Sequence, residues 1–173
     1  KADQVDETFM VELMKILRLS ENPMGAIRFQ QSFYKGLLNI ETESIQEPLN
    51  GLIERVKCMV QIGVTHEAIK TVESNRELSE SPEGAYLIGL SWRQARECSK
   101  AIPYLERALN APSATKELKN VASELLVECF LFLGNTEAAR ELILQLEPSL
   151  FRELMSLILK LYMSPTTELA TQL

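Results

Sequence analysis

Apolar residues recur along most of the chain at spacings of three and four, which places them on one face of a helix. Short segments rich in glycine, proline or polar residues interrupt this pattern and divide it into nine helices. Eight of these are expected in pairs, each closed by a tight turn. The predicted ranges are 6–19, 24–38, 49–62, 66–78, a pair within 81–111, 116–133, a helix that closes at 146, and 148–163.

The clearest pair lies between Ser81 and Ala111. Two helices approach to about 8–10 Å only where the contact points carry little side chain, and Gly89 and Ala101 are predicted to allow that approach. Ser81 followed by Pro82 predicts a helix start, because the hydroxyl can cap the helix and the missing proline N–H would have had no partner. Pro103 would break a helix interior, so the second helix is expected to begin near residue 99 or 100.

This pair resembles a tetratricopeptide repeat, a helix–turn–helix unit of about 34 residues. Ala101 has counterparts in Ala68, 33 residues earlier, and Ala139, 38 residues later, and Ala26 marks a weaker first copy. The resemblance implies an all-α fold: a right-handed α-solenoid of about four tetratricopeptide-like helix pairs plus a C-terminal capping helix. The central pair departs from the family at its turn, where Ala95 and Arg96 replace the usual leucine and glycine.

The domain organisation follows from the same pattern. Residues 1–163 are expected to form a single repeat domain, with the best-matching repeats over 49–146 and the final helix over 148–163. We predict that residues 39–47 form a polar connector and that residues 164–173 form a frayed tail. Because the first residue is Lys1 rather than Met, we expect the chain to be a segment of a larger protein.

Composition narrows the class of protein. Of the 173 residues, 46% are apolar, which is enough for a core, and the net charge is −6 with a pI near 5.0. An acidic chain disfavours general nucleic-acid binding and an anionic membrane surface, since both require basic patches. Three separated cysteines without metal-type spacing favour a reducing, intracellular compartment, whether cytoplasmic or nuclear. No apolar run approaches the 18 residues of a membrane span.

Candidate chemistry is sparse. His66 is the only histidine, and a general base would need a positioned partner and a pocket. The glycines form no phosphate-binding motif. We therefore predict no enzyme, no cofactor and no metal site. The cysteines, Cys58, Cys98 and Cys129, are expected to be small buried hydrophobic residues.

The resemblance also implies a binding surface, because in this family the first helix of each pair lines a groove that takes a peptide or a helix of a partner. The positions carried over are Lys15, Arg18, Ile53, Lys57, Tyr86, Leu90, Arg93, Glu124, Glu128 and Leu131. This groove would be basic at its first repeat, apolar in the middle and acidic at its last. We therefore expect a segment of complementary charge to bind there.

The final helix is apolar nearly all round, more than a cap requires. It could pack only under the last repeat, or it could present a second interface through Leu154, Leu157, Ile158, Leu161 and Tyr162. The predicted function is a non-catalytic scaffold or adaptor module for protein–protein interaction and complex assembly. The alternatives are an RNA-binding helical repeat and self-association, as a homo-oligomer, through the final helix.

Overall fold

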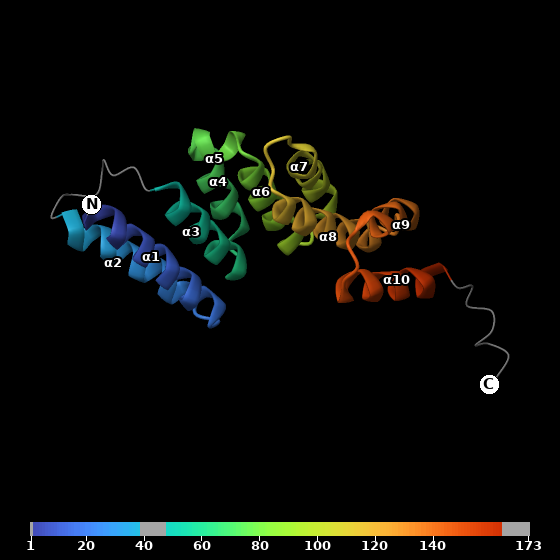
Figure 1. The fold of residues 1–173 in the computed structure, drawn as a ribbon, viewed down its shortest axis with the longest axis horizontal. Helices are drawn as coiled ribbons and strands as arrows, with labels where there is room; N and C mark the ends of the chain where they lie inside the picture. The colour runs from blue at the N-terminus through green and yellow to red at the C-terminus, as the bar shows by residue number, and fades with distance from the viewer. Residues whose placement is uncertain (1, 39–47, 164–173) are drawn as a thin grey trace. The chain divides into compact units, whose positions relative to one another are not determined.

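A computed structural model describes residues 2–38 and 48–163 of the chain (Figure 1). Within these ranges every regular element is a helix and none is a strand, which confirms the predicted all-α class. Ten helices occur there: α1 (Ala2–Leu19), α2 (Pro23–Leu38), α3 (Leu49–Gln61), α4 (Thr65–Ser74), α5 (Arg76–Glu80), α6 (Pro82–Gln94), α7 (Cys98–Asn110), α8 (Lys116–Phe132), α9 (Thr136–Gln145) and α10 (Leu150–Met163).

The helices belong to two compact units, which we call unit 1 (residues 1–80, with α1 to α5) and unit 2 (residues 81–173, with α6 to α10). One continuous repeat domain over 1–163 therefore stays a prediction. The predicted connector at 39–47 and tail at 164–173 lie outside the described residues.

In unit 1, α1 and α2 pack together and both contact α3, which in turn packs on α4. Met10, Met14, Ala26 and Cys58 are fully buried at the centre of this contact. Gln30 adds a buried polar link, because its Nε2 donates a hydrogen bond of 3.1 Å to the backbone carbonyl of Gly51. α3 is thus held against α2 by a specific bond as well as by apolar burial.

In unit 2, successive helices from α6 to α10 pack side by side, and α8 also contacts α6 and α10. Gly89 confirms the predicted close approach of α6 and α7. A Cβ atom there would lie 2.7 Å from Leu105 side-chain carbons and 3.4 Å from the carbonyl oxygen of Ala101. Any larger residue would force the two helices apart.

The start of α6 confirms the predicted cap, and the start of α2 is capped in the same way. The Oγ of Ser81 accepts a hydrogen bond of 2.9 Å from the Gly84 N–H, with Pro82 as the first helical residue. The Oδ1 of Asn22 accepts one of 3.0 Å from the Gly25 N–H. α7 begins at Cys98, slightly before the predicted start, so Pro103 lies inside the helix.

The predicted helix over 66–78 is wrong. α4 ends at Ser74, and Asn75 takes an extended backbone (φ −104°, ψ 110°) before α5 begins. The Oδ1 of Asn75 accepts a hydrogen bond of 2.9 Å from the Leu78 N–H. Asparagine competes with the helix for backbone donors and caps a new one, so the apolar spacing alone gave one helix too few.

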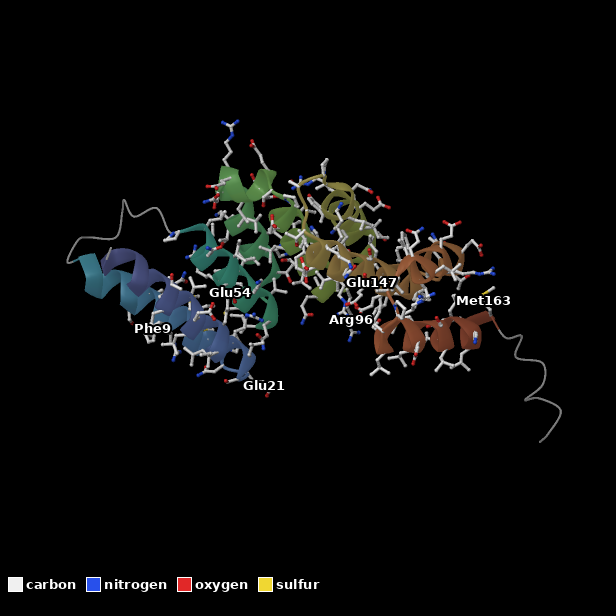
Figure 2. The ribbon with its side chains drawn as sticks, viewed as in Figure 1. Phe9, Glu21, Glu54, Arg96, Glu147 and Met163 are labelled. Atoms are coloured by element: carbon white, nitrogen blue, oxygen red, sulfur yellow. The ribbon has the colours of Figure 1, made fainter. Side chains whose placement is uncertain are left out.

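The same turn occurs four times in the described chain. Glu21, Gly63, Arg96 and Gly134 each have a positive φ, of 59°, 83°, 63° and 73°. In every case this residue's N–H donates to the carbonyl three residues back, and the next N–H donates to the carbonyl five residues back, over 2.9–3.2 Å. This is the Schellman motif that ends a helix. Figure 2 labels Glu21 and Arg96, the two positions that lack a glycine.

These turns give a direct test of backbone strain. We expect Arg96→Gly to stabilise the chain by about 0.5–1 kcal/mol, because left-handed strain of about 1–2 kcal/mol exceeds the entropy that glycine adds to the unfolded chain. Gly134→Ala should destabilise by about 1 kcal/mol, although no atom lies within 4 Å of the added Cβ. Urea denaturation followed by circular dichroism measures both.

Glu106→Gly is the matched control, since Glu106 is an exposed residue inside α7. It should cost about 1 kcal/mol through helix propensity. If Arg96→Gly costs as much as this control, strain at Arg96 is not relieved and the interpretation of the turn is wrong.

Candidate functional site

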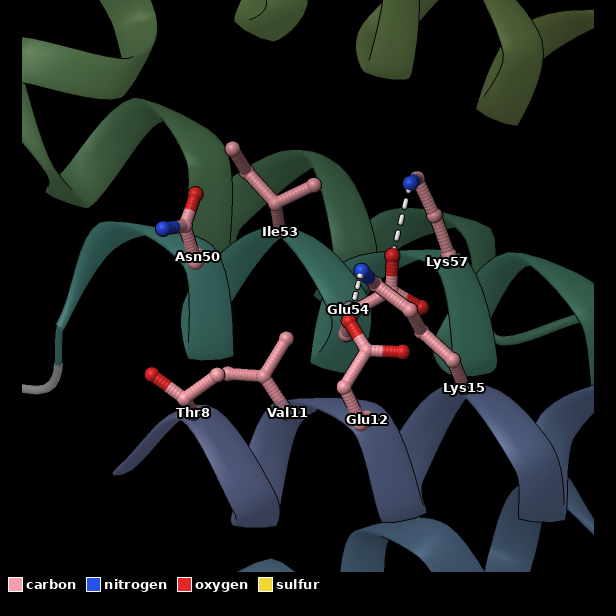
Figure 3. Close-up of a pocket in the computed structure, with 8 residues that line it drawn as sticks. All are labelled: Thr8, Val11, Glu12, Lys15, Asn50, Ile53, Glu54 and Lys57. Carbon is pink, nitrogen blue, oxygen red and sulfur yellow. Dashed lines mark hydrogen bonds and ion pairs between the residues drawn. The ribbon is translucent and has the colours of Figure 1, made fainter. Parts of the chain in front are cut away.

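An open cleft of about 320 Å³ lies between α1 and α3 in unit 1 (Figure 3). Each helix lines it with four residues at the same spacing: Thr8, Val11, Glu12 and Lys15 from α1, and Asn50, Ile53, Glu54 and Lys57 from α3. The order in both rows is a small polar residue, an aliphatic residue, a glutamate and a lysine. The cleft is therefore built from one four-residue pattern that occurs twice.

Helix geometry explains why these side chains meet. Residues at i, i+3, i+4 and i+7 share one helix face, and α1 and α3 contact each other directly. Figure 3 shows both lysines at one end of the cleft and Thr8 with Asn50 at the other. The predicted residues Lys15, Ile53 and Lys57 are thus brought together.

Glu54 is the central charged residue of the cleft. Its side chain is only 3% exposed, yet it is an anion between two cations. One carboxylate oxygen lies 3.0 Å from the Nε of Arg18 and the other 2.7 Å from the Nζ of Lys57. Glu54, Arg18 and Lys57 together carry a net charge of +1. This pairing also fixes Arg18, a predicted site residue, against α3.

Lys15 is held less firmly than Lys57. Its Nζ lies 2.7 Å from a carboxylate oxygen of Glu12, whose side chain is 58% exposed. An exposed pair three residues apart contributes well under 1 kcal/mol, so an incoming carboxylate can replace Glu12 at low cost. The end of the cleft at Lys15 and Lys57 therefore favours a negatively charged group beside the apolar contact of Ile53, which is half-buried.

Sequence reasoning missed Glu54. Glu54 lies among the buried residues of α3, and the apolar spacing of that helix predicts Leu52 and Val56 as its core residues instead. The available signal was its spacing of three from Lys57 and the repeat of the glutamate–lysine pattern first seen at Glu12 and Lys15. A buried carboxylate needs a cationic partner. Lys57, one turn after Glu54, is one of the two cations that compensate its charge.

Cys58 lies next to this charged group and is fully buried. The pKa of its thiol is raised to about 11, chiefly by burial; the Arg18 cation opposes this shift, the Glu54 carboxylate adds to it and the Lys57 cation opposes it. All three cysteines are buried, as predicted. In unit 2 burial raises the pKa of Cys129 to about 12, with a smaller contribution from its hydrogen bond to Cys98.

The other predicted groove residues lie in unit 2, at positions equivalent to those of unit 1. Tyr86 and Leu90 are half-buried on α6, and Glu124 is half-buried on α8. Arg93 forms an ion pair with Glu128 across the α6–α8 contact, so the Glu128 charge is compensated within the chain. Leu131 is 8% exposed and belongs to the core formed with Ala139 and Ile143, so it offers little surface.

The final helix presents two different faces. Ile158 is half-buried against the core, whereas Leu154, Leu157, Leu161 and Tyr162 are 50%, 57%, 76% and 65% exposed. Four of the five residues predicted for a second interface are thus on the surface.

Within the described ranges, no group of three or more histidine, cysteine, aspartate or glutamate side chains is placed to hold a metal ion. No helix there is both long and apolar enough to cross a bilayer. Comparison with protein-family models, with curated proteins and with solved structures finds no match to this chain. The cleft must therefore be interpreted from its own chemistry.

Removing the buried carboxylate should destabilise unit 1. We expect Glu54→Ala to lower the free energy of unfolding by about 3 kcal/mol, because Arg18 and Lys57 would then repel each other without a counter-charge. Denaturant titration measures the loss. Glu73→Ala is the control, since Glu73 is exposed on α4 and should change stability by less than about 0.5 kcal/mol. Equal effects would show that the ion cluster has no structural role.

The buried thiols should react slowly. A pKa near 11 instead of 9.0 lowers the thiolate fraction of Cys58 at pH 8 about a hundredfold. A variant that keeps only Cys58 has alanine in place of Cys98 and Cys129. With this variant, an aromatic disulfide reagent should react at least about a hundredfold more slowly with the folded protein than with the urea-unfolded protein. The folded rate should keep rising with pH beyond 9, and a plateau at pH 9 would contradict the raised pKa.

Proposed function

We propose that this chain is a non-catalytic scaffold module built from tetratricopeptide-like helix pairs, which binds a segment of a partner protein through the first helices of its pairs. The support for repetition is the turn that recurs at Glu21, Gly63, Arg96 and Gly134. Every predicted groove residue lies ten, six or three residues before one of these four positions. Such regularity is typical of stacked helical repeats.

The observation that carries the proposal is the cleft between α1 and α3. It combines an aliphatic contact from the half-buried Ile53 with two lysines at one end, while Val11 is buried beneath it as part of the core. The ligand class that fits is an extended or helical peptide with an apolar side chain next to an acidic one. Assembly of a protein complex then requires only that such a segment be exposed on another subunit.

The charge of the cleft explains how an acidic chain can attract an acidic segment. The whole protein carries −6, but Arg18, Lys57 and Glu54 together retain +1 and Lys15 adds an exchangeable cation. Screening confines the repulsion from distant surface acids to about 8–10 Å at physiological salt. Local attraction at the cleft therefore decides where the segment binds.

Selection from a display library of random peptides tests this proposal. The selected sequences should place a carboxylate near an aliphatic or aromatic residue, and one of them is synthesised for fluorescence-anisotropy titration. The variant Lys15→Gln/Lys57→Gln should weaken its binding by at least roughly tenfold, which is about 1.4 kcal/mol. Added salt should weaken the wild type more than the variant.

Lys70→Gln is the matched control, since Lys70 is an exposed lysine on α4, and it should bind like the wild type. Ile53→Asp should abolish binding by removing the apolar contact. The proposal fails if no peptide is selected, or if the selected peptides bind the lysine variants and the Ile53 variant with unchanged affinity.

A further inference from the structure

α10 has an outer apolar face that its own unit does not use. On the inner face, Met155 and Leu159 are buried in the core with Val127 and Ile143, and Phe151 and Ile158 pack at its edge. The outer face carries a second row of leucines, which we call the leucine seam: Leu150, Leu154, Leu157 and Leu161. These side chains are 82%, 50%, 57% and 76% exposed. Four exposed leucines on one helix are costly in water unless another surface covers them.

The spacing of the leucine seam specifies what kind of surface fits it. The steps of four, three and four residues are those of the a and d positions of a coiled coil, which pack against a second helix. A helix that lies along α10 fits this spacing, because its side chains can pack between the seam leucines.

Two charged residues flank the leucine seam on its exposed edge. Glu153 and Lys160 are both exposed and occupy equivalent positions in successive heptads, each directly before a seam leucine. The opposite edge is formed by Phe151 and Ile158, which are half-buried against the core of unit 2. One edge of the seam thus carries one acid and one base, and the other edge carries no charge.

We propose that the leucine seam pairs with the same seam of a second copy of this chain, with the two α10 helices antiparallel about a two-fold axis. The axis would pass between Leu154 and Leu157. Leu154 would then meet Leu157 of the partner subunit, and Leu150 would meet Leu161 of the partner subunit. In this register Glu153 lies beside Lys160 of the partner subunit, and symmetry produces the ion pair twice.

The charge pattern favours this arrangement over a parallel one. In a parallel pair each flanking residue lies opposite a position five residues further along the other helix. Glu153 would then face Ile158 of the partner subunit, and no opposite charges would meet. An antiparallel copy brings opposite charges together on the exposed edge of the seam. The inference does not rest on the proposed peptide site, because no residue of α1 or α3 takes part.

Sedimentation velocity over a range of protein concentrations tests the dimer. A seam of four leucines per copy buries less area than a standard protein interface, so we expect a dissociation constant on the order of 10 µM. Leu154→Asp with Leu157→Asp should leave only monomer, while circular dichroism shows the helices retained. Leu19→Asp is the control, because Leu19 is an exposed leucine at the end of α1, and it should dimerise normally.

Charge exchange tests the orientation. Glu153→Lys alone and Lys160→Glu alone each place like charges together and should weaken dimerisation by roughly tenfold. The double variant Glu153→Lys/Lys160→Glu should restore the wild-type dissociation constant. A second copy oriented in parallel, or a dimer through another surface, would not show this rescue.

Zero-length cross-linking with a carbodiimide gives an independent measurement, because it joins a carboxylate to an amine as an amide with loss of water. Residues 153 and 160 are about 10 Å apart along one helix, so isotope-labelled and unlabelled copies are mixed and only a cross-link that joins a labelled to an unlabelled peptide is counted. A Glu153–Lys160 cross-link in the dimer band, found by mass spectrometry of the digest, would support the proposal. A chain that stays monomeric at every concentration, single charge variants that dimerise like the wild type, or a double variant that stays weak would overturn it. So would binding of a different protein's helix with the chain itself monomeric.

Discussion

The left-handed residue at the end of each first helix is the constraint on which the rest of the architecture depends. It stops the helix, reverses the chain and closes the same two backbone hydrogen bonds at Glu21, Gly63, Arg96 and Gly134. Because the turn is the same, the second helix leaves in the same way each time and the two apolar faces meet. Two of these positions lack glycine, so packing of the helices outweighs a backbone cost of about 1–2 kcal/mol at each.

The cleft shows how the same regularity produces a site. Thr8 to Lys15 and Asn50 to Lys57 are equivalent segments, and their contact aligns two copies of one pattern face to face. The two glutamates differ in burial, since Glu54 is buried while Glu12 is exposed. The buried glutamate fixes its two cations and holds α1 on α3, whereas the exposed one leaves its lysine exchangeable. In the proposed peptide site, Glu54 would thus serve the structure and Glu12 would leave Lys15 available for a ligand.

Much of the fold could be predicted from the sequence because its signals are local. Ser81 and Asn22 cap helix starts through bonds to residues within one turn. Gly89 allows a close helix crossing because it has no side chain. The break at Asn75 was missed because an asparagine inside an apolar pattern is compatible with a continuous helix until its side chain finds a donor.

The site was less predictable because its decisive interactions join distant residues. Arg18 and Glu54 are 36 residues apart, and Arg93 and Glu128 are 35 apart. Helical spacing placed Lys15, Ile53 and Lys57 on the helix faces that line the cleft. It could not show that Glu54 is buried between cations, that Arg93 compensates Glu128, or that Leu131 belongs to the core.

Contacts between helices in both units join elements that are neighbours or next neighbours along the chain. The loops that folding must close are therefore short, and each closure is soon followed by apolar burial. Low contact order of this kind favours rapid folding that starts locally and spreads from one helix pair to the next. It also lets a terminal helix open without loss of the remaining core, which gives the ends of such a chain a lower local stability than its middle.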